Sequence, residues 1–514
     1  MNKIFLGLIL AVAAYFRFYN NTAVALWHDE AFSALYIAKY GWGEMMHRII
    51  LDVHPPLYYL VLRVWSYVFG HSLLSLRGFS ILLGLLTVWA GYLLVKQAFK
   101  NENWALVAAL FLAINPFQIQ YSLEARMYTL GTFLVLFSSY LLLKALEKPK
   151  FSLWLAYAIT VAACAYTHYF LLFSLAAQGI FWFFYVLAKY KFSFLKAREF
   201  LMGAGSYILA GLLYVPWLPS FFEQRTRVAS GYWIGKPDQW AVPGTIWKMT
   251  FGGQGTNHTV LAITSVIALM IIGYFIAKVR GSGKWLVFLS VFVPFAAALV
   301  MSYTTSIYQD RYFVFASLFF AILIALALLQ IPRYSMKSVL VSVFVIITVV
   351  AFYKNWRDLD VKNLFTNREI NNKPGMAKAA SIVNEQSQPN DKIFVASSFV
   401  YFTFQYYYNG YNHTWNKNQD PKWPLLLSDI PLSQIPHFSG TAILSEEDLQ
   451  PTTNGGLVPQ NAVNKNSNAW VVWTTGFGGS KPNIPGNWSQ VGEWEAPDTP
   501  GFKGSIFVTE YHVK

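Results

Sequence analysis

Residues 76–97 read LRGFSILLGLLTVWAGYLLVKQ, an almost unbroken apolar run with one arginine near its start and one lysine near its end. A helix of about 20 apolar residues spans the hydrocarbon core of a bilayer. Similar runs recur along the chain, which is 55% hydrophobic and only 12% charged over its 514 residues. This composition excludes an ordinary soluble protein and predicts a polytopic α-helical membrane protein.

We expect about eleven transmembrane helices, since apolar windows of nearly spanning length continue as far as residue 353. The first follows Lys3 and is similar to a signal peptide, but no small-residue cleavage site comes after it, so we expect it to be retained. The predicted spans are residues 4–19, 76–97, 104–120, 128–146, 152–168, 169–188, 200–219, 259–277, 285–303, 312–330 and 337–353.

The connections between these spans divide into two alternating sets. By the positive-inside rule, the set rich in lysine and arginine faces the cytoplasm together with the N-terminus, so the other set faces outward. The net charge of +14 is explained largely by the inner loops beside anionic lipid and indicates no nucleic-acid partner. The inner set holds Lys96, Lys100, Lys144, Lys148, Lys150, Lys189, Lys191, Lys196, Arg198, Lys278, Arg280, Lys284, Arg333 and Lys337.

The outward set carries the polar clusters. Titratable groups close to a bilayer are costly and are usually functional. Because the clusters share one predicted face, we expect an extracytoplasmic site in a multi-pass protein of the cell membrane. They are WHDEAF at 27–32 and DVHPPLYY at 52–59 in the first outer loop (20–75), YSLEARMY at 121–128, residues 166–169, loop 220–258 and YQDRY at 308–312.

After residue 353 the sequence becomes polar, and short β-rich runs alternate with turn signals. This pattern predicts a linker at 354–374 and a small α/β domain at 375–514, which an odd number of spans places outside the cell. We expect this domain either to recognise the substrate or to act as a lid. A purely structural role, as a cap on the membrane part, is an equal alternative. The expected strands are 392–397, 469–475 and 504–512, and the expected helices are 375–387 and 399–408.

The chemistry of the outer clusters suits a phosphate leaving group. Asp29 and Glu30 are neighbours, so on a helix they diverge by about 100° and cannot form the carboxylate pair of a retaining glycosidase. One of them can still act as a general base, provided that the leaving group needs no proton. Cationic side chains in or near the outward set suit a phosphate, and they are His54, Arg126, Arg311, Arg17 and Arg77.

Each residue also has a structural interpretation. Asp29 and Glu30 fit the first turn of a helix that begins near Ala31. Glu124 and Arg126 fit an interfacial ion pair, Arg311 fits a snorkelling anchor, and His168 fits a hydrogen-bonded interface residue. The single cysteine, Cys164, lies in an apolar span and is expected to serve packing only.

The order of the motifs resembles a known family. An acidic pair in the first outer loop, D-x-HPPL about twenty residues later, an arginine opening the next span and an EAR turn after the third span are similar to the protein O-mannosyltransferase and aminoarabinose transferase group. These family-39-like membrane glycosyltransferases have the GT-C fold and take sugars from polyprenyl phosphates. The resemblance covers about residues 1–330. The chain departs from the eukaryotic members, which carry HPPLGK where Tyr58 and Tyr59 follow Leu57 here, and a trefoil domain in a long mid-chain loop.

The resemblance therefore implies a bacterial or archaeal envelope transferase with a lipid, glycan or protein acceptor. It assigns Asp29 as the base that activates the acceptor hydroxyl, with Glu30 as its companion, and implies a single displacement that inverts the sugar. His54, Glu124, Arg126 and Arg311 would organise the site and contact the donor phosphate, and Asp52, Tyr58, Tyr128 and His168 would line the acceptor pocket. No cofactor is certain; a divalent metal ion on Asp29, Asp52 and His54 is left open.

Other interpretations stay open. A transporter or flippase of a lipid-linked sugar needs no catalytic base, but the spans show neither mid-span charges nor an internal repeat, which favours an enzyme. A ligase that moves a whole glycan from a diphosphate carrier is a further alternative. Loop 220–258, with GGQG at 252–255, is expected either to close over the donor or to form an interfacial amphipathic segment.

Overall fold

The computed structural model describes residues 2–19, 21, 22, 24–230, 234–253, 255–358, 375–409, 423–429, 441–453, 455–476, 479–498 and 504–514. The chain forms two compact units. Unit 1 comprises Met1–Tyr19, His54–Tyr58 and Gly78–Asn355; unit 2 comprises Asn20–Val53, Tyr59–Arg77 and Trp356–Lys514. The predicted linker at 354–374 lies mostly outside the described residues.

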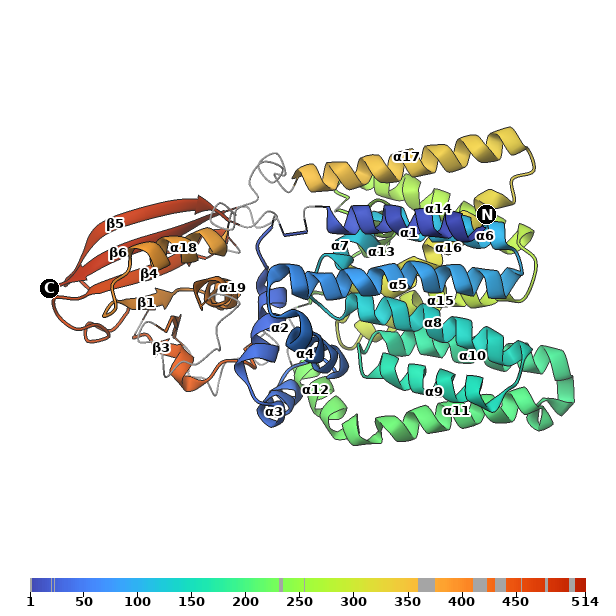
Figure 1. Cartoon of the computed structure of the whole chain (residues 1–514), viewed down its shortest axis with the longest axis horizontal. Helices are drawn as coiled ribbons and strands as arrows, with labels where there is room; N and C mark the ends of the chain where they lie inside the picture. Colours follow the sequence, from blue (N-terminus) through green and yellow to red (C-terminus); the bar gives the residue numbers. More distant parts are fainter. Residues whose placement is uncertain are drawn as a thin grey trace. The chain divides into compact units, whose positions relative to one another are not determined.

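Unit 1 is a bundle of long helices that lie side by side (Figure 1). Eight of the described helices are long and apolar enough to cross a membrane, or nine if the bent pair α6 and α7 is one span. All the predicted spans are helical, but α1 and α9 have only 17 and 15 residues. The helices are α1 (Asn2–Phe18), α5 (Leu73–Phe99, which begins in unit 2), α6 (Glu102–Ile114), α7 (Pro116–Ser122), α8 (Tyr128–Glu147), α9 (Phe151–Ala165), α10 (Leu171–Tyr190), α11 (Arg198–Tyr214), α12 (Leu218–Ser230), α13 (Ala241–Phe251), α14 (His258–Lys278), α15 (Gly283–Ser302), α16 (Val314–Leu329) and α17 (Tyr334–Asp358), with the 3-10 turns η1 (Lys191–Lys196), η2 (Val215–Trp217) and η3 (Asp310–Phe313).

Burial separates the central helix of unit 1 from the peripheral ones. The span that contains α16 is 89% buried, whereas the spans of α14 and α17 are 17% and 6% buried. A helix that is apolar on every side needs apolar surroundings, which protein supplies for α16 and which lipid is expected to supply for α14 and α17. The core of unit 1 is therefore built around α16.

A break between α6 and α7 precedes the EAR turn at residues 124–126. Asn115 ends α6, and its side chain accepts the Gln118 backbone N–H at 3.0 Å, which caps α7. Pro116 takes the first position of α7, and the two helices meet at an angle of 59°. Helix α7 ends at Ser122, and residues 123–127 form a turn before α8.

Residues 28–69, within the predicted first outer loop, are largely helical, and the helix expected near Ala31 begins at His28. Their helices are α2 (His28–Lys39), α3 (Trp42–Leu51) and α4 (Leu57–Phe69). Most of loop 220–258 is also helical, as α12 and α13, while its residues 231–233 and 254 lie outside the described residues. Hydrophobic spacing in short segments does not separate an interfacial helix from a loop with apolar anchors.

The C-terminal part of unit 2 is a six-stranded mixed sheet in the order β3-β2-β1-β4-β6-β5. Strand β1 is parallel to β2 and β4, while β6 is antiparallel to β4 and β5. The predicted strands occur as β1, β4 and β6, and the predicted helices as α18 and α19, which confirms a small α/β domain. The elements are α18 (Met376–Gln386), β1 (Lys392–Val395), α19 (Ser398–Asn409), β2 (Leu425–Ser428), η8 (Glu446–Asp448), β3 (Leu449–Pro451), β4 (Asn468–Thr474), β5 (Trp488–Pro497) and β6 (Ser505–Val513).

Helix α2 packs on α19 within unit 2. The His28 ring lies 5.1 Å from the Phe399 ring, and the Phe32 ring lies 5.9 Å from the Phe402 ring. The Leu26 backbone N–H donates to the Tyr407 hydroxyl at 2.9 Å. The helix that carries Asp29 and Glu30 is therefore held by the C-terminal domain.

Candidate functional site

Glu30, in the acidic pair at the start of α2, forms a buried ion pair with Arg77. Arg77 donates from Nε to Glu30 Oε1 at 2.8 Å and from Nη2 to Glu30 Oε2 at 2.7 Å. Arg77 also donates to the backbone carbonyls of Asn21, Val24 and Ala25. Both partners are buried, with Glu30 1% and Arg77 5% exposed. This bidentate pair commits Glu30 to holding the segment before α2.

Asp29 stands one residue earlier on α2 and is half-buried. Glu30 Oε2 also accepts the Trp27 backbone N–H at 3.3 Å, so Glu30 makes a capping contact at the N-terminus of the helix. The structural interpretation of the pair thus fits Glu30.

Tyr36 lies on the Asp29 side of α2, and the sequence analysis did not select it. Seven residues are nearly two helical turns, so Asp29 and Tyr36 lie on the same side of α2. Its ring stacks on Tyr59 at 5.0 Å, and its buried hydroxyl has no hydrogen-bond partner among the described residues. Burial, and then the Asp52 carboxylate, hold the pKa of Tyr36 well above its ordinary value, so the hydroxyl stays protonated. The seven-residue spacing from Asp29 was the available signal.

The far end of α2 is clamped by a second buried ion pair. Lys39 Nζ lies 2.6 Å from Asp448 Oδ2, with side chains 10% and 0% exposed. Asp448 also accepts from the Trp423 indole N–H at 3.0 Å and from the Ser445 hydroxyl at 2.8 Å. Burial alone would raise the pKa of Asp448, but Lys39 and the Ser445 hydrogen bonds outweigh burial and hold the pKa below its ordinary value.

Replacing Lys39 with alanine is expected to destabilise unit 2 by about 3–5 kcal/mol, because it leaves Asp448 charged and buried without its cation. The depressed pKa of Asp448 adds stability above the pKa of an unfolded aspartate, and this stability is lost as the pH falls through the lower, folded value. Thermal unfolding in detergent at neutral and acidic pH measures both effects.

The matched control is Lys481→Ala, since the Lys481–Glu493 pair in the same unit is more than a third exposed on both sides. Exposed pairs of this kind contribute little to stability. If Lys39→Ala melts at the same temperature as Lys481→Ala, the clamp does not stabilise unit 2.

Unit 1 gathers the other predicted residues around a buried histidine. His168 lies in the turn between α9 and α10 and is 4% exposed. Its ring lies 6.1 Å from that of His54, 6.0 Å from that of Tyr128 and 5.0 Å from that of Tyr312. Burial, followed by the positive fields of His54 and Arg126, lowers the pKa of His168 well below its ordinary value, so the ring is neutral.

The tautomer of His168 follows from its hydrogen bond. The Phe170 backbone N–H donates to His168 Nδ1 at 3.1 Å, so Nδ1 is the acceptor and Nε2 carries the proton. This Nε2–H is buried and has no hydrogen-bond partner within the part of the chain that the structure describes. An unmade hydrogen bond at a buried donor costs free energy that a ligand oxygen can recover.

Arg311 and Glu124 approach the same region from other elements. Arg311 lies in η3 and Glu124 in the turn after α7, and both act electrostatically on Tyr121, as do Asp310 and Tyr128. Arg126 is 3% exposed in the same turn, where its backbone N–H donates to the Glu124 carbonyl at 2.8 Å. Tyr58 is also fully buried in unit 1, with its ring 6.2 Å from that of Phe79.

The predicted residues thus divide between the units: Asp29, Glu30 and Asp52 belong to unit 2, and His54, Tyr58, Glu124, Arg126, Tyr128, His168 and Arg311 belong to unit 1. Arg17 and Arg77, which the sequence offered as phosphate ligands, serve the fold instead. Arg17 donates to Ser122 Oγ at 3.1 Å and to the Ala113 carbonyl at 2.9 Å, which joins α1 to α6 and α7. Across the described residues, no group of three or more His, Cys, Asp or Glu side chains has the spacing of a metal site.

Residues 53–218 match the family model of the dolichyl-phosphate-mannose-protein mannosyltransferases. ArnT from Cupriavidus metallidurans, in a crystal structure bound to undecaprenyl phosphate, is 13% identical with a TM-score of 0.60, and the match covers 98% of this chain and 97% of that one. The oligosaccharyltransferase of Archaeoglobus fulgidus is 13% identical with a TM-score of 0.49; the match covers 82% of this chain and spans 65% of the archaeal one. No curated protein sequence matches.

The full-length likeness to ArnT, at 13% identity, establishes the fold, and the family model places the mannosyltransferase signature over the turns that hold His54, Arg126 and His168. Both agree with the resemblance that the motifs had indicated. The chain therefore has the GT-C fold of ArnT, and its residues 53–218 are similar to the protein mannosyltransferases.

Proposed function

We propose that this protein is an inverting glycosyltransferase that moves a sugar from a polyprenyl-phosphate donor to an acceptor hydroxyl on the outer face of the membrane. The observation that carries the proposal is the neutral, buried His168, whose Nε2–H meets no acceptor among the described residues and lies beside His54 and Arg126. A phosphate oxygen satisfies this donor and the nearby guanidinium together. The undecaprenyl phosphate bound in ArnT, which shares this fold, supports a lipid phosphate as ligand.

In the proposed reaction the acceptor oxygen attacks C1 of the sugar while Asp29 takes the hydroxyl proton. The bond between C1 and the phosphate oxygen breaks, and the polyprenyl phosphate leaves as an anion. Arg126 and Arg311 stabilise the charge that develops on the phosphate, and His168 Nε2–H donates to one of its oxygens. We assign Asp29 as the base from the motif resemblance, and Glu30, which Arg77 holds, as its companion.

The outer-face assignment rests on the charge of the connections. The N-terminus, the lysine-rich connection between α10 and α11, and the connection between α16 and α17 that carries Arg333 lie at the same end of unit 1 (Figure 1). Positively charged ends face the cytoplasm. The opposite end of unit 1, which carries the turns of Arg126 and His168, is then assigned to the extracytoplasmic side.

The test is transfer from a panel of radiolabelled polyprenyl-phosphate sugars into envelope material, with purified protein in liposomes. Incorporation from one donor supports the proposal and identifies the sugar, and repetition in excess chelator tests for a metal requirement. If every donor fails and labelled lipid instead reaches the opposite leaflet, the protein is a flippase and the transferase proposal is wrong.

Replacement of His168 with phenylalanine keeps a ring of similar size but removes the Nε2–H donor. We expect the dissociation constant of undecaprenyl phosphate to rise by about 10- to 100-fold, since hydrogen bonds to charged groups contribute about 1.5–3 kcal/mol. Binding of the lipid in detergent measures this, and the matched control is His47→Phe at an exposed position of α3. Equal affinity of both variants would mean that His168 does not contact the phosphate.

A further inference from the structure

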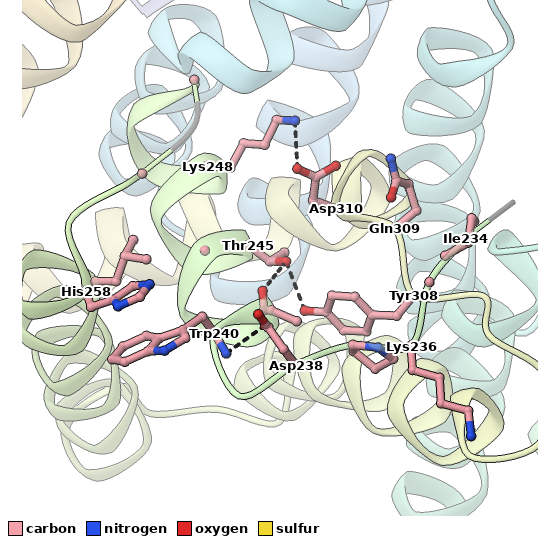
Figure 2. A pocket seen from close by; sticks show the side chains of 17 residues that line it. Ile234, Lys236, Asp238, Trp240, Thr245, Lys248, His258, Tyr308, Gln309 and Asp310 are labelled. Atoms are coloured by element: carbon pink, nitrogen blue, oxygen red, sulfur yellow. Dashed lines mark hydrogen bonds and ion pairs between the residues drawn. The ribbon is translucent and has the colours of Figure 1, made fainter. Parts of the chain in front are cut away.

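A cavity lies beside η3 in unit 1, on the side that carries Asp310. Figure 2 shows it between the segment before α13, helix α13, the start of α14 and the YQDR segment. Its volume is about 370 Å³, at the lower end of the range of small-molecule sites. The described lining is mostly polar and includes Lys236, Asp238, Trp240, Lys248, His258 and Gln309. None of these residues has a role in the mechanism proposed above.

The floor of this cavity is held in place by its own contacts. Lys248 Nζ lies 2.8 Å from Asp310 Oδ2, and the Thr245 and Tyr308 hydroxyls lie 2.9 Å apart (Figure 2). Thr245 and Tyr308 are 1% and 6% exposed. These contacts join α13 to η3, so the cavity has a fixed wall that adjoins Arg311.

Two aromatic rings, those of Trp240 and His258, line one side of the cavity. The Trp240 and His258 rings are stacked, with centroids 4.2 Å apart and planes 2° from parallel. The Trp240 backbone N–H donates to Asp238 Oδ1 at 2.9 Å, which places a carboxylate next to the indole (Figure 2). Apolar ring surface beside hydrogen-bonding groups suits a ligand that has C–H groups on one face and hydroxyls at its edges.

The charges in the cavity balance. Lys248 is paired with Asp310, and Lys236 is accompanied by Asp238 in the same segment. A phosphate would need an excess of cations, and a cationic ligand would need an excess of carboxylates. The cavity has no net charge and offers both hydrogen-bond donors and acceptors. The side-chain amide of Gln309, for example, provides one of each kind of group.

We propose that this cavity is a subsite for a neutral sugar ring, with the ring face on Trp240 and its hydroxyls on Asp238, Gln309 and Lys236. The proposal deepens the proposed function and rests on it for the identity of the substrate. Asp310 and Arg311 are consecutive in η3, so a sugar in the cavity lies within reach of a phosphate held by Arg311.

The ring belongs either to the lipid-linked donor or to a glycan acceptor. Binding of a panel of neutral methyl glycosides to the full chain in detergent is measured by saturation-transfer NMR, with and without saturating polyprenyl-phosphate sugar. Displacement of the glycoside by the donor assigns the cavity to the donor sugar, and persistence of its signal assigns it to an acceptor sugar. Both results support a sugar subsite.

The variants are Trp240→Ala and Gln309→Leu, with Trp285→Ala as the control because Trp285 is 45% exposed on α15 and does not line the cavity. We expect the dissociation constant of the glycoside to rise about tenfold in the first two variants, which corresponds to about 1.4 kcal/mol, and to stay unchanged in the third. Gln309→Leu keeps both aromatic rings, so this variant tests glycoside binding in the cavity if Trp240→Ala does not fold.

The proposal is overturned if no neutral glycoside binds, or if binding survives in Trp240→Ala and Gln309→Leu at the affinity of the wild type. The assay needs no turnover, so it separates the two proposals. Glycoside binding that depends on Trp240, without transfer from any donor, retains the subsite and rejects the transferase. Sugar transfer without such glycoside binding retains the transferase and rejects the subsite.

Discussion

Asp29→Asn is expected to lower kcat for sugar transfer by about 10²- to 10⁴-fold, the usual contribution of a positioned general base. Asparagine has a similar shape but cannot take the acceptor proton. We expect the affinity for undecaprenyl phosphate to stay the same, because the phosphate is assigned to Arg126, Arg311 and His168. The measurements are single-turnover transfer from the donor that the panel identifies, and lipid binding in detergent.

The matched control for Asp29→Asn is Glu44→Gln, which makes the same carboxylate-to-amide change in the first turn of α3 at a half-exposed side chain. We expect normal turnover from this variant. Full turnover in a folded Asp29→Asn protein would remove Asp29 as the base. Its remaining role would be the favourable charge of an acidic residue at a helix N-terminus.

Arg77→Ala is expected to destabilise unit 2 by about 3–5 kcal/mol, because it leaves the Glu30 carboxylate buried without its cation. It also removes the donors for the carbonyls of Asn21, Val24 and Ala25, so the segment before α2 loses its anchor. We therefore expect a lower melting temperature together with a loss of transfer. Thermal unfolding in detergent and the transfer assay measure the two effects.

Arg77→Lys tests the geometry of this pair. A lysine keeps the charge but cannot make two parallel hydrogen bonds to Glu30, so we expect an intermediate melting temperature. Lys100→Ala is the surface comparison, since its pair with Glu147 is exposed and contributes little. If Arg77→Ala and Lys100→Ala melt together, the buried pair does not hold unit 2. Loss of transfer without loss of stability would give Arg77 a direct part in the reaction.

The two predictions separate chemistry from support. Asp29→Asn is expected to change turnover and leave stability intact, whereas Arg77→Ala is expected to change both. Asp29 and Glu30 are adjacent and chemically alike, and the pair with Arg77 assigns the supporting role to Glu30.

Local signals in the sequence predicted the membrane architecture. Hydropathy is a property of each segment by itself, so the apolar runs located the spanning helices, and the β-rich runs located β1, β4 and β6. The sequence did not locate β2 and β3, which have four and three residues, or β5, where exposed polar residues alternate with partly buried ones. Short strands such as β2 and β3 carry little pattern, and their neighbours in the sheet supply most of the signal that they are strands.

The motifs also selected the residues of the candidate site, and their catalytic roles stay predictions. The sequence predicted chemistry at WHDEAF and HPPL from polar groups placed near a bilayer, a cost that is visible without a structure. It predicted Arg17 and Arg77 as phosphate ligands. The charge of a guanidinium does not show whether the group binds a ligand or forms hydrogen bonds between packed helices.

The sequence by itself therefore determined the class of protein, the membrane spans and the kinds of side chain present in the outer clusters. Only the tertiary structure decided which residues contact one another. Glu30 meets Arg77 across 47 residues, Lys39 meets Asp448 across 409, and the cavity at Trp240 joins residues about seventy positions apart. Hydropathy and propensity act between near neighbours, whereas these contacts depend on how separate helices and strands pack, which no local pattern encodes.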